Sequence, residues 1–141
     1  QTATGPKVIE FNARFGDPET QVVLARLESP LSEIISSLLV KEQPTIAWNE
    51  LASVGVVVAA EGYPNQYKTN LPLPEMSGET IYYAGVTRSE QALVSAGGRI
   101  FLAEATASTL EEARKKVYQT LDNYSFPGMY YRKDIGVKGL I

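Results

Sequence analysis

The pattern of apolar and polar positions predicts three strands and a hairpin. Short runs of β-branched and aromatic residues, which favour strands, lie at residues 7–11, 53–64 and 79–87. The run at 53–64 is nearly all apolar, so we expect it to be central in a sheet. Residues 91–107 predict a hairpin with Gly97 and Gly98 at its turn.

Apolar residues at helical spacing predict two helices in the first third of the chain. The first helix, residues 18–27, has Pro18 in its first turn, where a missing N–H costs little. Glu19 complements the positive end of its dipole. The second helix follows Ser29, and its apolar stripe consists of Leu31, Ile34, Ile35, Leu38 and Leu39.

A third helix, residues 108–124, has the clearest pattern. Ser108 and Glu111 have the spacing of a capping box, in which each side chain bonds a backbone N–H that the helix leaves free. The expected buried face consists of Leu110, Ala113, Val117, Leu121 and Tyr124. Residues 126–141 predict a turn followed by an irregular or short extended tail.

These elements predict an α+β fold, in which a strand and two helices precede a mostly antiparallel sheet with packed helices. The strand at 7–11 has no obvious partner nearby. A polar-faced strand that carries a site usually belongs to a larger sheet. We therefore expect this chain to be the C-terminal part of a longer protein.

Composition narrows the classes of function. The 141 residues include 13 basic and 16 acidic residues, with no basic stripe, so we expect no nucleic-acid partner. No apolar run approaches the roughly 18 residues of a membrane span, so we expect no membrane association. The absence of cysteine and histidine excludes disulfides and thiolate or imidazole metal ligands. We expect a cytoplasmic protein.

Charged residues crowd the stretch after the first expected strand. Glu10 and Asn12 would project from one face of that strand, and both offer the oxygen ligands that Mg²⁺ prefers. Arg14 could meet an oxyanion or phosphate, and Asp17 and Glu19 could hold an ammonium group. The alternative is a solvated sheet end with surface ion pairs, which the spacing alone favours because Glu-x-Asn is common by chance.

The complete string "PKVIEFNARFGDPETQ" closely resembles the signature of the glycinamide ribonucleotide synthetase (phosphoribosylamine–glycine ligase) family of the ATP-grasp superfamily. The stretches "ASVGVVVAAEGYPNQY", "YYAGVT", "GGRIFLAEATASTLEEARKKVY" and "YRKDIG" are similar to later blocks of that family, in the same order. The resemblance implies that residues 1–42 are the end of the ATP-grasp domain and residues 43–141 the C-terminal domain. Complete members of the family are much longer than this chain.

The resemblance also implies a reaction and its participants. Members of the family join 5-phosphoribosylamine to glycine, with cleavage of ATP to ADP and phosphate, in purine synthesis. Glu10 and Asn12 match the residues that hold Mg²⁺ (or Mn²⁺) against the ATP phosphates. Arg14 matches a catalytic arginine that contacts the transferring phosphate or the acyl phosphate. Asp17, Pro18 and Glu19 match the stretch beside the glycine and phosphoribosylamine site.

Two further charged positions have alternative interpretations. Arg99 could reach a substrate phosphate or could be a solvated hairpin arginine. Residues 132–134 form a cluster that we expect to make local ion pairs and to hold the tail. The competing hypothesis for the whole chain is a free-standing, non-catalytic interaction module. Under the enzyme hypothesis, the 141 residues alone fold but are inactive.

Overall fold

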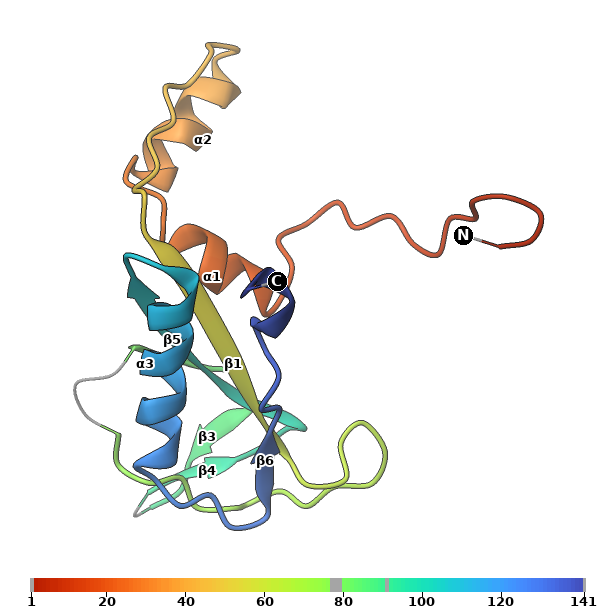
Figure 1. Cartoon of the computed structure of the whole chain (residues 1–141), viewed down its shortest axis with the longest axis vertical. Helices are drawn as coiled ribbons and strands as arrows, with labels where there is room; N and C mark the ends of the chain where they lie inside the picture. The colour runs from red at the N-terminus through yellow and green to blue at the C-terminus, as the bar shows by residue number, and fades with distance from the viewer. Residues whose placement is uncertain (1, 77–79, 91, 141) are drawn as a thin grey trace.

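The computed structural model describes residues 2–76, 80–90 and 92–140. Its central element is a four-stranded antiparallel sheet (Figure 1). The strand order is β2-β5-β1-β6. The strands are β1 (Ala52–Ala60), β2 (Thr80–Tyr83), β5 (Arg99–Ala107) and β6 (Met129–Tyr131). β1 is central, between β5 and β6, as the all-apolar run predicted. The expected mostly antiparallel α+β fold is confirmed.

The strand and hairpin predicted after β1 form one long bent hairpin. β2 continues into β3 (Val86–Arg88), the chain reverses between Ser89 and Ala92, and it returns through β4 (Leu93–Ser95) and β5. Positions 79 and 91, where two predicted elements began, lie outside the described residues.

The predicted turn at Gly97 and Gly98 is wrong. A Cβ atom at Gly85 would lie 2.7 Å from the Cα atom of Gly97. Glycines are therefore needed there because the two arms of the hairpin bend and approach closely, not because the chain reverses direction.

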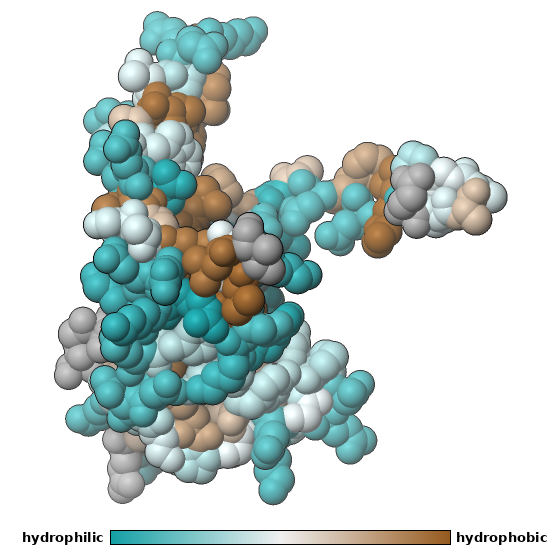
Figure 2. All heavy atoms as spheres, in the orientation of Figure 1, coloured by the Kyte–Doolittle hydropathy of each residue, from teal (hydrophilic) through white to brown (hydrophobic). Residues whose placement is uncertain are grey.

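Two helices precede the sheet. The first predicted helix is confirmed in a shorter form as α1 (Glu19–Leu24), and it packs on β1. The second is α2 (Leu31–Leu39), which projects beyond the sheet (Figure 1). Of its predicted apolar stripe only Ile34 is buried, while Leu38 and Leu39 are exposed. Figure 2 shows hydrophobic surface over this helix.

The main core lies between the sheet and α3 (Leu110–Asp122). The buried side chains on the two sides of this core include Val54, Val56, Val58, Ala113, Val117 and Leu121. The predicted capping box is displaced by one residue, because Thr109 is the N-cap and its Oγ1 accepts a hydrogen bond from the Glu112 backbone N–H at 3.2 Å. Ser108 is therefore not the cap. Tyr124 is only half-buried, whereas Tyr118 is buried on the same helix.

The C-terminal tail contains the short extended piece that the sequence predicted, as β6, and ends in η1 (Val137–Leu140). Two side chains of α3 bind its backbone. The Tyr118 hydroxyl donates to the Arg132 carbonyl at 2.6 Å and accepts from the Ile135 N–H at 3.2 Å. The Arg114 guanidinium donates to the carbonyls of Lys133 and Ile135.

The predicted strand at residues 7–11 is wrong. Residues 7–15, which we call the arm, extend away from the sheet with no β-partner among the described residues (Figure 1). Val8 is 71% exposed, Ile9 98% and Phe11 90%. A strand is stabilised by the hydrogen bonds of a neighbouring strand, and the described part of the chain supplies no such neighbour here.

Within that described part, no helix is long and apolar enough to span a bilayer.

Candidate functional site

Asp17 and Arg99, both predicted to bind substrate, are in direct contact although they lie 82 residues apart. Arg99 opens β5, and its Nη1 donates to the Asp17 backbone carbonyl at 2.6 Å. Its Nη2 lies 3.2 Å from the Asp17 carboxylate oxygen Oδ2. Gln21 Nε2 donates to the other carboxylate oxygen, Oδ1, at 3.1 Å. We call Asp17, Gln21 and Arg99 the Asp17 cluster.

Pro18 and Glu19 lie beside this cluster at the start of α1. Pro18 is the N-cap residue, and Glu19 is the exposed first helical residue, whose acidic side chain suits the positive end of the helix dipole. Thr20 donates from both its backbone N–H and its hydroxyl to the carbonyl of the buried Gly16. Two hydrogen bonds therefore join Gly16, just before Asp17, to the first turn of the helix.

Glu10, Asn12 and Arg14 lie on the exposed arm. Asn12 Oδ1 accepts from the Arg14 backbone N–H at 3.4 Å, and Arg14 Nη1 donates to the Phe15 carbonyl at 3.1 Å. These bonds stay within the arm. The structure thus brings Asp17, Pro18, Glu19 and Arg99 together and leaves the two predicted metal ligands on a separate segment.

Glu10 and Asn12 offer a carboxylate and an amide carbonyl, which is the donor chemistry that suits Mg²⁺. Among the residues that the structure describes, no group of three or more Asp, Glu, His or Cys residues lies close enough to hold a metal ion. The two side chains offer oxygen atoms of the kind that this ion prefers. Phosphate oxygens commonly supply other ligands to Mg²⁺ in such sites.

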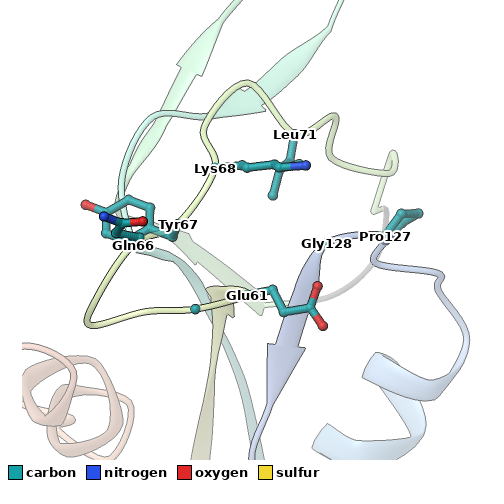
Figure 3. A pocket seen from close by; sticks show the side chains of 8 residues that line it. Glu61, Gln66, Tyr67, Lys68, Leu71, Pro127 and Gly128 are labelled. Carbon is teal, nitrogen blue, oxygen red and sulfur yellow. The ribbon is translucent and has the colours of Figure 1, made fainter.

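An open hollow of about 670 Å³ lies between the loop after β1 and the residues before β6 (Figure 3). Glu61, Gln66, Tyr67 and Lys68 border it. No predicted site residue lines this hollow. The same loop also contains Tyr63. A Cβ atom at Gly98 would lie 2.7 Å from the Tyr63 ring atom Cε2, so this loop packs against Gly98, the residue before Arg99.

Gln21 was not among the predicted site residues. Its signal was its position four residues after Asp17, because residues separated by four lie on the same face of a helix. The predicted start of the helix at residue 18 already placed Asp17 at its entrance. Tyr63 carried no such signal, since its partner Gly98 is distant in sequence.

The charged residues near the C-terminus form the predicted local ion pairs. Arg132 Nη2 lies 2.6 Å from Asp134 Oδ2, and Lys133 Nζ lies 2.8 Å from Asp122 Oδ1. The hydrogen bond from Lys133 lowers the pKa of Asp122, and the reciprocal bond raises the pKa of Lys133. Burial, followed by its bond to Asp122, raises the pKa of Tyr131. The Lys133–Asp122 pair ties the tail to the end of α3, whereas the Arg132–Asp134 pair lies within the tail.

The fold and the Asp17 cluster define an α+β domain in which the polar cluster lies where the preceding segment meets the sheet. The family model "Phosphoribosylglycinamide synthetase, C domain" matches residues 53–138. The chain therefore belongs to the phosphoribosylglycinamide synthetase family.

Named relatives agree with this assignment. The chain is 50% identical to the phosphoribosylamine–glycine ligase of Halalkalibacterium halodurans and 49% identical to that of Lactococcus lactis, over 99% of its own length in each case. It spans 33% and 34% of those relatives. The crystal structure of the phosphoribosylamine–glycine ligase of Thermotoga maritima matches 92% of the chain and 33% of that protein, with a TM-score of 0.81 and 31% identity.

Proposed function

We propose that this chain is the C-terminal third of a phosphoribosylamine–glycine ligase. The parent protein would join 5-phosphoribosylamine to glycine and cleave ATP to ADP and phosphate, in purine synthesis. The observation that carries this proposal is the 50% identity to a named ligase over 99% of the chain. Purine synthesis, ATP and the two other substrates come to this chain through that similarity.

The arm and the Asp17 cluster supply the residues that we assign to this reaction. Glu10 and Asn12 are the proposed ligands of Mg²⁺ (or Mn²⁺), with oxygen atoms that suit the ion. When bound, the metal neutralises negative charge on the phosphate oxygens during phosphoryl transfer. Arg14 offers a guanidinium group to the transferring phosphate.

Asp17, Pro18, Glu19 and Arg99 are assigned to the region of glycine and phosphoribosylamine. The contact between Asp17 and Arg99 supports a common location for these four residues. Within this assignment the negative charges of Asp17 and Glu19 attract an ammonium group, and the exposed Glu19 carboxylate is the one available for direct contact.

We assign residues 1–42 to the end of an ATP-grasp domain and residues 43–141 to the C-terminal domain. The family match at 53–138 lies within the second range. Apolar side chains on the arm and α2 are exposed here, including Ile9, Phe11 and Leu39. Figure 2 shows hydrophobic surface on both segments. An apolar surface of this kind suits burial against the preceding part of the parent protein.

The test is ligase activity of the full-length parent. With ATP, glycine and phosphoribosylamine, we expect equal amounts of ADP, phosphate and glycinamide ribonucleotide, detected by coupled assay and mass spectrometry. The 141-residue chain is the control and should fold without turnover. A parent protein that hydrolyses no ATP with these substrates, or ligase activity from the 141 residues alone, would refute the proposal.

A further inference from the structure

We propose that Arg99 and Gln21 are positioning residues that act through Asp17. They fix the orientation of the turn between the arm and α1, and so the approach of Arg14 and the arm to the reacting groups. This inference rests on the proposed ligase function. It assigns Arg99 a role different from direct contact with a substrate phosphate, and it gives Gln21 a role.

The contact of Arg99 fixes both the backbone and the side chain of Asp17. Nη1 binds the backbone carbonyl at 2.6 Å, while Nη2 lies 3.2 Å from the carboxylate. A contact with the carboxylate alone would leave the backbone free to rotate. A planar guanidinium with two engaged N–H groups restrains position and direction together.

Arg99 projects from a rigid part of the molecule. It pairs with Ala59 at the end of the β1–β5 ladder, and the next two residues, Ile100 and Phe101, are 0% and 1% exposed. Buried strand residues are held in place by close packing. Arg99 therefore transmits the position of the sheet to the turn that contains Asp17.

Gln21 binds the other oxygen of the Asp17 carboxylate, although this places its own amide oxygen in an unfavourable environment. Its Nε2 donates to Asp17 Oδ1, but its Oε1 is buried and has no hydrogen-bond partner among the residues that the structure describes. A buried acceptor without a donor destabilises a folded protein. An apolar side chain would avoid that penalty, so the bond to Asp17 is what distinguishes glutamine at this position.

Arg99 is already engaged, which favours positioning over substrate binding. Both of its terminal nitrogens contact Asp17, and the carboxylate balances its charge. A substrate phosphate would have to displace Asp17 to form the same two bonds. Acting through Asp17, Arg99 needs no such exchange.

A double-mutant cycle in the full-length parent separates the two roles. We expect Arg99→Met to lower kcat by about 10- to 100-fold through misplacement of reacting groups, with little change in KM. Asp17→Asn should also lower kcat. Arg99→Met should cost less in the Asp17→Asn background than in the wild type, because the contact with the Asp17 carboxylate is already lost there while the bond to the backbone carbonyl remains. Losses that multiply in the double variant would show that Arg99 acts independently of Asp17 and overturn the inference.

Gln21→Leu tests the second residue against Gln119→Leu, a matched change on the exposed face of α3. We expect Gln21→Leu to lower kcat while its melting temperature equals or exceeds that of the wild type. The control should leave kcat unchanged. A lower melting temperature with unchanged kcat would show that Gln21 is only structural.

Hydrogen exchange distinguishes failure of this inference from failure of the proposed function. In Arg99→Met, the amide of Thr20, which donates to Gly16, should exchange faster than in the wild type, whether or not the protein is a ligase. A wild-type parent without ligase activity would refute the proposed function alone. Unchanged exchange across residues 16–20 would refute the positioning role.

Discussion

Val22 of α1 rests directly on Gly55 in the middle of β1. A Cβ atom at Gly55 would lie 2.6 Å from Val22 Cγ2 and 2.9 Å from Leu102 Cδ1. Val54 and Val56, on either side of Gly55, are buried in the core with α3. Because side chains alternate along a strand, α1 and α3 cover opposite faces of the sheet. The contact between Val22 and Gly55 also fixes the position of α1, the helix that follows Asp17, on the sheet.

Gly55→Ala should destabilise the chain, because the added methyl group enters space occupied by two side chains. We expect a loss of about 1–3 kcal/mol, as for other overpacked sites. Denaturant unfolding measures it. Val22→Ala in the Gly55→Ala background should restore part of this loss by removing the colliding methyl groups. Losses that simply add in the double variant would contradict the contact.

Thr109→Ala should remove the N-cap of α3 and lower the free energy of unfolding by about 0.5–2 kcal/mol. Ser108→Ala is the matched control. It should change stability by less than about 0.5 kcal/mol, since Ser108 is an exposed residue outside the cap. Thermal and urea unfolding of both variants decide the point. Equal losses of unfolding free energy in the two variants would contradict the assignment of Thr109 as the N-cap.

The stabilisation from Lys133 should depend on pH. Its bond lowers the pKa of Asp122, so this stabilisation is complete above the carboxyl's unfolded pKa of about 3.9 and is lost as pH falls through the lower folded value. Lys133→Met should therefore lower the melting temperature slightly at pH 7 and less at low pH.

The residual effect of Lys133→Met at low pH should come from the Lys133 ammonium over the Tyr131 ring, 4.2 Å from its centroid. Lys115→Met, on the exposed face of α3, is the control and should show no comparable pH dependence in this range. A difference between wild type and Lys133→Met that stays constant from pH 7 to acid would contradict the pairing.

Glu10→Gln in the full-length parent should lower turnover far more than stability. The change preserves side-chain size but removes the charge proposed to hold Mg²⁺. Steady-state rates against Mg²⁺ concentration, with melting curves in parallel, measure both effects. Glu75→Gln, at another exposed position, should keep the wild-type rate and Mg²⁺ dependence. If Glu10→Gln also matches the wild type, Glu10 is not a metal ligand.

Elements with a complete local pattern could be predicted from the sequence. The β1 segment is a nearly continuous apolar run and α3 has apolar residues at helical spacing, and both elements appear close to the expected positions. The cap of α3 shifted by one residue because Thr109 and Glu112 have the same spacing as Ser108 and Glu111. Local spacing alone cannot distinguish two such pairs.

Features that depend on distant partners could not be predicted in the same way. The strand expected at residues 7–11 had suitable residues, but a strand also needs a neighbour. Gly97 and Gly98 indicated a turn, whereas their position opposite Gly85 makes them the bend of a longer hairpin. The contact between Asp17 and Arg99 joins residues 82 apart, which no local pattern reveals.

The central position of β1 constrains the order in which the protein can fold during synthesis. Both of its neighbours, β5 and β6, come much later in the chain, with Ala52 opposite Ala107 and Ala60 opposite Met129. As the ribosome adds residues from the N-terminus, the apolar strand emerges long before either partner exists. We therefore expect the nascent chain to be most prone to aggregation between the synthesis of residue 60 and that of residue 107, when this strand has both edges unpaired.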